Sequence, residues 1–162
     1  RDIKPGNVLL YHPAEDVSHA RRWVKLTDFG LAHALGEDFG HGDVRTFAGT
    51  PAYMAPEQIA GRTGDLGPWT DLYALGVLLF ELFTGRLPYE ANSLGELLRA
   101  IHRSPRLRVA QARPDLPPGL GQALDAIVAP LLEREPQARM GDGASWAAWA
   151  AQVLPEIPSQ RS

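Results

Sequence analysis

The chain has 162 residues, 44% of them hydrophobic and 22% charged, which is the balance of an ordinary globular domain rather than of a disordered chain. Its formal net charge of −3 provides no broad basic field, so we expect no nucleic-acid partner. Because the sequence contains no cysteine, disulfide frameworks, thiol nucleophiles and cysteine-ligated zinc sites are excluded.

Two short β-prone runs lie near the start of the chain. Residues 8–10 and 23–26 predict two strands, joined by the polar residues 11–22. Residues 32–68 are rich in Gly, Pro, Thr and Asp, and they are too broken for a long helix. A loop of that length inside a compact domain is usually functional or disordered.

Helices are predicted after residue 69. Residues 72–83 form an apolar run that follows Asp71, a good helix N-cap, and stops before Gly85. The run is shorter than the roughly 20 residues that a membrane-spanning helix needs. We therefore expect a helix buried at the centre of the core.

Three further helices are predicted. Ser93 and Glu96 form a capping box, which predicts a helix whose apolar face contains residues 94, 97, 98 and 101. Another helix is expected over 121–133, kinked or broken at Pro130, and a last one over 144–154.

The first eight residues carry groups that phosphoryl transfer requires. The carboxylate of Asp2 can orient an attacking hydroxyl and accept its proton, and Lys4 can neutralise charge on the transferring group. Asn7 offers an amide oxygen to a hard cation such as Mg²⁺. The same residues also fit a polar turn around Pro5 and Gly6, so this segment alone leaves both interpretations open.

A second carboxylate follows the second predicted strand. Residues 28–30 read Asp-Phe-Gly, in which Asp28 can ligate a metal ion that bridges nucleotide phosphates. Taken alone, this tripeptide fits an aspartate that caps a turn better than it fits a metal ligand.

A third motif, Ala-Pro-Glu at 55–57, closes the glycine-rich loop. Arg-Asp with an Asn five residues after the Asp, then Asp-Phe-Gly, then Ala-Pro-Glu occur in this order in the signature of protein kinases. The chain resembles the protein kinase family over residues 1–154, lacking only the His that precedes Arg1 in the signature. Residues 155–162 are expected to be a polar tail.

The resemblance implies a mainly α fold. It is the fold of a kinase C-terminal lobe, a helical bundle with a small β-hairpin that carries the catalytic and metal-binding loops. The sequence contains no Gly-rich phosphate loop, strand lysine or partner glutamate, all of which belong to the N-terminal lobe in this family. We therefore expect residues 1–154 to form the C-terminal lobe without its N-terminal lobe, and to be inactive alone.

The resemblance also implies roles for individual residues of the nucleotide site. Asp2 would be the catalytic aspartate, and Lys4 two residues later is typical of serine/threonine kinases rather than tyrosine kinases. Asn7 and Asp28 would hold Mg²⁺ on the phosphates of ATP, and Leu9 would form the floor of the adenine pocket.

Other roles concern the substrate, regulation and structure. Gly49 and Thr50 would line the substrate groove. Arg1 is typical of kinases activated by loop phosphorylation, for which Thr46 is the expected site. Two structural contacts are also implied, one from Asp71 to the catalytic-loop backbone and one between Glu57 and Arg139.

The function implied is transfer of the γ-phosphate of ATP to Ser/Thr hydroxyls of a protein substrate. One alternative is a pseudokinase scaffold, against which the intact catalytic and metal-binding residues argue. The other is a small-molecule kinase of the aminoglycoside phosphotransferase type, against which Ala-Pro-Glu and the long activation segment argue.

The source is indicated by the basic residues. They are almost all arginine, with only Lys4 and Lys25 as lysines, and alanine is abundant, as a high-GC bacterial genome would produce. The resemblance is then to bacterial kinases of the eukaryotic type. We expect a cytoplasmic location and no membrane contact for these residues, with any membrane anchor outside them.

Overall fold

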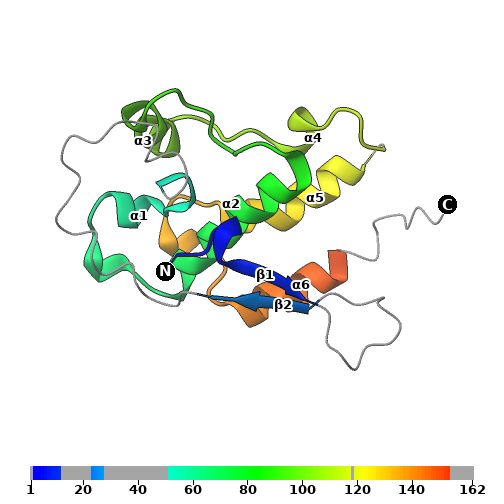
Figure 1. Ribbon diagram of the computed structural model, residues 1–162, viewed down its shortest axis with the longest axis horizontal. Helices are drawn as coiled ribbons and strands as arrows, with labels where there is room; N and C mark the ends of the chain where they lie inside the picture. Colours follow the sequence, from blue (N-terminus) through cyan, green and yellow to red (C-terminus); the bar gives the residue numbers. More distant parts are fainter. Residues whose placement is uncertain (1, 12–22, 28–50, 118, 154–162) are drawn as a thin grey trace.

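The computed structural model describes residues 2–11, 23–27, 51–117 and 119–153 (Figure 1). Within these ranges the fold is mostly helical, with one two-stranded antiparallel sheet. The fold class predicted from the sequence is confirmed at this level. No helix of the described ranges is long and apolar enough to cross a membrane.

The sheet consists of β1 (Val8–Tyr11) and β2 (Trp23–Leu26), so both predicted strands are confirmed. Val8 lies opposite Leu26 and Tyr11 opposite Trp23. The hairpin exposes apolar side chains on both of its faces, since Leu10 is 59% exposed and Trp23 is 53% exposed. Few side chains of the described residues therefore cover this hairpin.

The centre of the fold is α2 (Pro68–Thr84), whose residues Tyr73, Val77 and Phe80 are completely buried. This confirms the predicted central helix. The prediction that Asp71 is its N-cap is wrong, because Gly67 takes that position and Pro68 begins the helix. Asp71 lies instead in the first turn, where a negative charge interacts favourably with the helix dipole.

The helix α3 (Leu94–Arg103) begins as predicted. Ser93 is its N-cap, and the Ser93 hydroxyl accepts a hydrogen bond from the N–H of Glu96 at 3.2 Å. The Glu96 carboxylate in turn accepts from the N–H of Asn92 at 2.9 Å. Two backbone donors at the start of the helix are thus satisfied locally.

The C-terminal half contains α5 (Leu120–Val128) and α6 (Gly143–Val153). The break predicted at Pro130 in the helix over 121–133 is confirmed, because α5 ends at Val128 and the chain changes to a 3-10 turn over Ala129–Leu131. Two short helices, α1 (Pro56–Ile59) and α4 (Val109–Ala112), have no counterpart among the predicted elements.

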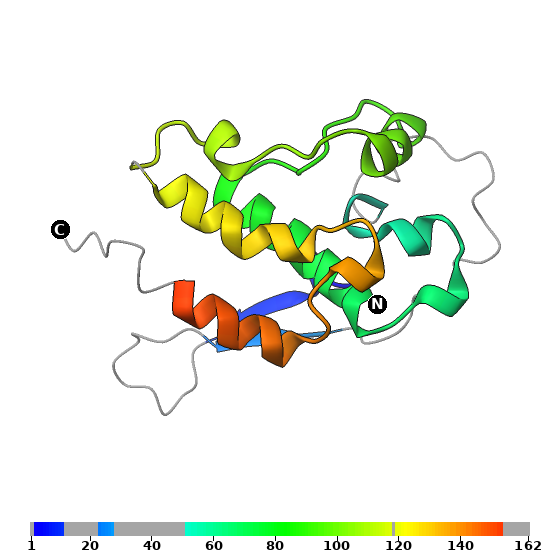
Figure 2. The ribbon, with the colours of Figure 1, turned by 180° about the vertical axis from the view of Figure 1, so that it is seen from behind.

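The close approach of α2 to the 3-10 turn after α5 depends on Gly76. Figure 2 shows α5 in front of α2, and the 3-10 turn after α5 also contacts α2. A Cβ at position 76 would lie 2.8 Å from Leu131 Cβ and 2.9 Å from Leu132 Cδ2. Glycine therefore permits a backbone distance that a larger residue prevents.

We expect Gly76→Ala to lower the free energy of unfolding, measured by urea denaturation. Alanine gains roughly 0.5–1 kcal/mol over glycine inside a helix. Displacing Leu131 and Leu132 costs about 1–3 kcal/mol, which is the larger effect.

The matched control is Gly64→Ala, because a Cβ at position 64 meets nothing within 4 Å. If Gly76→Ala were as stable as that control, the tight contact between α2 and Leu131 would not exist.

Candidate active site

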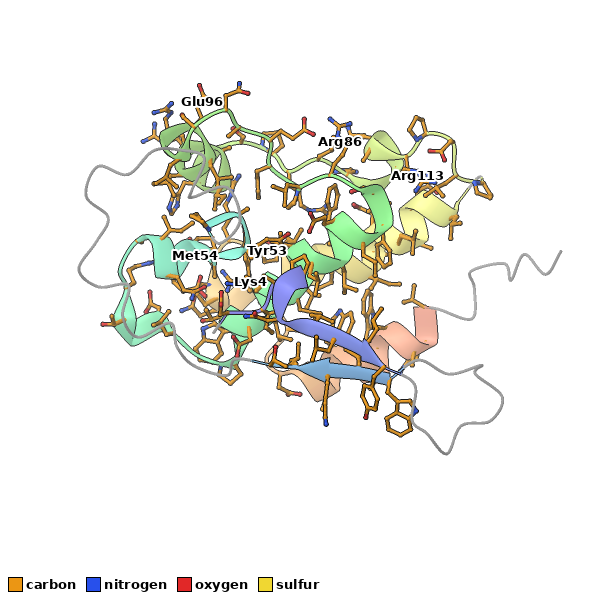
Figure 3. All side chains as sticks on the ribbon, viewed as in Figure 1. Lys4, Tyr53, Met54, Arg86, Glu96 and Arg113 are labelled. Atoms are coloured by element: carbon orange, nitrogen blue, oxygen red, sulfur yellow. The ribbon has the colours of Figure 1, made fainter. Side chains whose placement is uncertain are left out.

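The first turn of the described chain gathers three of the predicted site residues. Residues Pro5–Asn7 form one 3-10 turn, closed by the N–H of Asn7 donating to the Lys4 carbonyl at 3.0 Å. The turn brings the Asn7 amide nitrogen back to Asp2, where it donates to the backbone oxygen at 2.7 Å and to Oδ2 at 3.0 Å. Lys4 Nζ lies 2.7 Å from the same Oδ2 (Figure 3).

Exposure differs among these three residues in a way that suits their chemistry. The side chains of Asp2 and Lys4 are 24% and 28% exposed, so a substrate can reach both charges. Asn7 is only 6% exposed, and its position is set by its two donations to Asp2. Both donations come from Nδ2, and the amide oxygen Oδ1, which takes no part in them, is the type of atom that a hard cation binds.

Thr27 connects this turn to the end of β2. Its N–H donates to the Asn7 carbonyl at 2.9 Å, and its hydroxyl donates to the same oxygen at 3.4 Å. We refer to residues 2–7, which contain the predicted catalytic residues, as the catalytic turn. The next residue after Thr27 is Asp28, so this turn is bound to the backbone directly before the second predicted metal ligand. Sequence reasoning missed Thr27, although its place between β2 and Asp-Phe-Gly was a signal.

Five predicted site residues lie outside the described residues: Arg1, Asp28, Thr46, Gly49 and Thr50. Among the residues that are described, no group of three or more His, Cys, Asp or Glu side chains could hold a metal ion. Leu9 lies in β1 and is 50% exposed, which leaves its side chain free to contact a ligand.

The chain after Thr50 is anchored to α2. Pro51–Tyr53 form a buried 3-10 turn, and the Tyr53 hydroxyl donates a hydrogen bond to Oε2 of Glu81. Burial raises the pKa of Tyr53, and the Glu81 carboxylate raises it further, so the phenol stays a proton donor. Sequence reasoning missed both residues, since their contact joins positions 28 residues apart.

A buried ion pair joins Glu57 to Arg139. Arg139 NH1 and NH2 each lie 2.7 Å from one Glu57 oxygen, and both side chains are completely buried. The remaining guanidinium donors bind the backbone oxygens of Trp69, Glu133 and Arg134. All five N–H donors of the arginine are therefore satisfied.

Two residues of α2 complete the surroundings of this pair. The Thr70 hydroxyl donates to Glu57 Oε1 at 3.0 Å, and the Arg139 guanidinium lies 4.9 Å from the centre of the Tyr73 ring. Burial alone would raise the pKa of Glu57, but the hydrogen bonds and charge of Arg139 outweigh it and lower this pKa. The carboxylate therefore remains ionised in the interior.

Asp71, predicted to hold the catalytic-loop backbone, is half-buried in the first turn of α2. This places it one residue after Thr70, whose hydroxyl binds Glu57. Its contact with the catalytic loop stays a prediction.

The comparisons with known proteins agree with one another. A family model described as "Protein kinase domain" matches residues 1–154. The serine/threonine-protein kinase PknJ of Mycobacterium tuberculosis is 36% identical over 157 residues, which cover 95% of this chain and 25% of PknJ. The serine/threonine-protein kinase Pkn1 of Myxococcus xanthus is 34% identical over 139 residues, or 86% of this chain and 19% of Pkn1.

A likeness to a solved structure supports the fold. The autoinhibited serine kinase domain of the giant muscle protein titin matches with a TM-score of 0.54 and 22% sequence identity. The match covers 68% of this chain and 33% of the titin chain. The present chain thus spans a quarter or less of PknJ and Pkn1, and about a third of that titin structure.

Arg139→Met should lower the free energy of unfolding by about 3–5 kcal/mol, because the Glu57 carboxylate then stays buried without its counter-charge. Urea or thermal denaturation measures the change. The control is Arg86→Met, which removes an equally bidentate but exposed pair with Glu90 and should change little. Equal effects of the two substitutions would contradict the role given to the buried pair.

Acid should weaken the fold through Glu57. Because its pKa is lowered in the folded state, the pair stabilises the fold above the ordinary value of about 4.5, and this stabilisation is lost as the pH falls below that value. In urea denaturation at a series of pH values, Glu57→Gln should be less stable than the unsubstituted protein at neutral pH. Its free energy of unfolding should also fall less than that of the unsubstituted protein as the pH is lowered. Asp125, whose pKa is also lowered, keeps part of the pH dependence in the variant. If the free energy of unfolding of Glu57→Gln depended on pH as steeply as that of the unsubstituted protein, Glu57 would not be the group that acid titrates.

Proposed function

The chain belongs to the protein kinase family, and we propose that it supplies the C-terminal lobe of an enzyme that transfers the γ-phosphate of ATP to Ser/Thr hydroxyls of protein substrates. The observation that carries the proposal is the catalytic turn, in which Lys4 and Asn7 both contact one oxygen of Asp2. The serine/threonine kinases PknJ and Pkn1 support the same hydroxyl specificity.

Each residue of the catalytic turn has a separate role in phosphoryl transfer. Asp2, held by Asn7 and Lys4, orients the substrate hydroxyl and accepts its proton. Lys4 places its ammonium where negative charge develops on the transferring group. Asn7 and Asp28 would hold Mg²⁺, and Mg²⁺-ATP, when bound, supplies the phosphoryl group and offsets its charge.

Nucleotide and substrate would contact the neighbouring segments. The exposed Leu9 forms the floor of the adenine pocket, and Gly49 and Thr50 line the substrate groove. That groove is supported by Tyr53, whose hydrogen bond to Glu81 holds the following turn on α2.

Regulation is assigned to the activation segment, the chain between Asp-Phe-Gly at 28–30 and Ala-Pro-Glu at 55–57. Phosphorylated Thr46 would pair with Arg1, since a phosphate carries about two negative charges that a guanidinium binds well. Asp71 would hold the backbone of the catalytic loop in place.

Residues 1–154 are the proposed lobe, and 155–162 its polar tail. A complete nucleotide cleft also needs a Gly-rich loop and a lysine from an N-terminal lobe, and the sequence contains neither motif. The exposed apolar side chains of the hairpin support further protein packing around this cleft. ATP as the phosphate donor places the reaction in the cytoplasm.

The test is phosphate incorporation by the complete kinase domain with Mg²⁺ and ATP, mapped by mass spectrometry. Asp2→Asn should lower the rate by about 10²–10⁴-fold, because it removes the proton acceptor. Phosphate should appear on Thr46 in the unsubstituted enzyme and not in this variant.

Asp115→Asn is the control, because Asp115 is exposed and pairs with Arg113 rather than with a site residue. Absence of phosphate transfer by the unsubstituted enzyme, to itself or to a generic protein, would refute catalysis and leave the pseudokinase scaffold.

A further inference from the structure

The stretch between Glu96, in the first turn of α3, and Asp115, after α4, has a charge unlike that of the rest of the chain. Residues 97–114 contain five arginines, one histidine and no Asp or Glu, although the chain as a whole has a net charge of −3. Figures 1 and 2 both place α3, α4 and their connection along one edge of the molecule, away from the hairpin and from the catalytic turn. The positive charge is therefore concentrated on one edge.

Two of these five arginines are already neutralised. Arg106 binds both oxygens of Asp125 at 2.8 and 3.1 Å, and Arg113 binds both oxygens of Asp115 at 2.8 and 2.7 Å. The Arg106–Asp125 pair is structural, because Asp125 also accepts a hydrogen bond from the N–H of Val109 and so holds the start of α4. The Arg113–Asp115 pair is exposed, and Arg113 also donates to the Phe83 carbonyl at 3.1 Å.

The other three arginines are exposed, and their guanidinium groups have no hydrogen bond or ion pair with any described residue. We refer to Arg99, Arg103 and Arg108 together as the basic face. Arg99 and Arg103 are one turn apart on α3, an arrangement that destabilises a helix through like-charge repulsion. Arg108 lies close enough to Asp125 to interact with its charge, but both carboxylate oxygens of Asp125 are already bound by Arg106.

A cavity adjoins the basic face. It has a volume of about 540 Å³, and it lies between the chain after α2 and the chain after α3. Its apolar lining includes Pro88, Tyr89, Ala100 and Pro105, and Arg108 is among its polar lining residues. The one acidic lining residue, Glu90, is already paired with Arg86 through both of its carboxylate oxygens. The cavity is large enough for an apolar side chain, with positive charge beside it.

The cavity is built on a supported backbone. The N–H of Leu107 donates to the Pro88 carbonyl at 2.9 Å, which joins its two walls. Arg134 donates to the carbonyl oxygens of Ile101, at 2.7 Å, and of Ser104, which holds the C-terminal end of α3. The backbone that carries the basic face and the cavity is therefore held in place by contacts within the chain.

We propose that the basic face and this cavity form a docking surface for an acidic peptide segment of a protein partner. Carboxylates of the segment pair with Arg99, Arg103 and Arg108, and one apolar side chain enters the cavity. Charge complementarity carries the choice of an acidic partner, and the apolar lining favours a peptide over a nucleic acid, which would offer phosphates without an aliphatic side chain. Docking here does not depend on phosphoryl transfer at Asp2.

The experiment measures fluorescence anisotropy of a labelled peptide in which glutamates and aspartates flank one leucine, titrated with the complete protein. A counterpart with Gln and Asn in place of the acids should bind much more weakly. Substituting all three arginines of the basic face by serine should weaken binding of the acidic peptide about tenfold or more, since each exposed pair contributes a factor of about two to five. Replacing all three by lysine should retain most of the affinity.

Two controls separate the site from net charge and from folding. Arg62→Ser removes one exposed charge from another part of the molecule, so it should leave the affinity unchanged where Arg99→Ser reduces it. Thermal unfolding of every variant identifies any loss of structure, and the lysine variant then provides the folded comparison.

The cavity is tested with Ala100→Trp, which should fill it. The unsubstituted protein should prefer the leucine peptide several-fold over an alanine peptide, and this preference should disappear in the variant. The proposal would be overturned if the triple serine variant bound the acidic peptide as tightly as the unsubstituted protein does. It would also be overturned if the unsubstituted protein showed no preference for the leucine peptide over the alanine peptide. The proposal would also be overturned if oligouridylate or phosphatidylglycerol vesicles bound more tightly than the peptide and lost this binding in the triple serine variant.

Discussion

The buried pair between Glu57 and Arg139 is the contact on which the rest of the fold depends. It joins residues 82 positions apart, and the guanidinium also binds three backbone oxygens that have no other side-chain partner here. An isolated charge in such a place would be too costly to bury, so the geometry has to be nearly complete for the pair to stabilise the fold. This geometry is complete, because all five N–H donors of Arg139 form hydrogen bonds.

This pair determines where the functional segments lie relative to one another. Glu57 follows the buried turn Pro51–Tyr53, which comes directly after the residues proposed to line the substrate groove, while Thr70 and Trp69 belong to the first turn of α2. The same helix holds Tyr53 through Glu81, about three turns further on. The central helix thus carries both anchors of residues 51–57, and the rigid packing of α2 sets their separation.

The catalytic turn is built in a different way. Asp2, Lys4 and Asn7 are within six residues, and the turn around Pro5 and Gly6 is enough to bring them together. The polar-turn interpretation and the catalytic one therefore describe the same geometry. Thr27, which binds the Asn7 carbonyl, and the pairing of β1 with β2 connect this local arrangement to the strand that precedes Asp28.

By itself the sequence determined the family, the two strands, the central helix, the start of α3 and the break at Pro130. These features follow from short-range patterns, in which an apolar period, a cap residue or a proline acts within one or two turns. Tertiary structure alone decided that Tyr53 binds Glu81 and that Arg106 binds Asp125. Each of these depends on groups brought together by folding, and no local pattern records their distance.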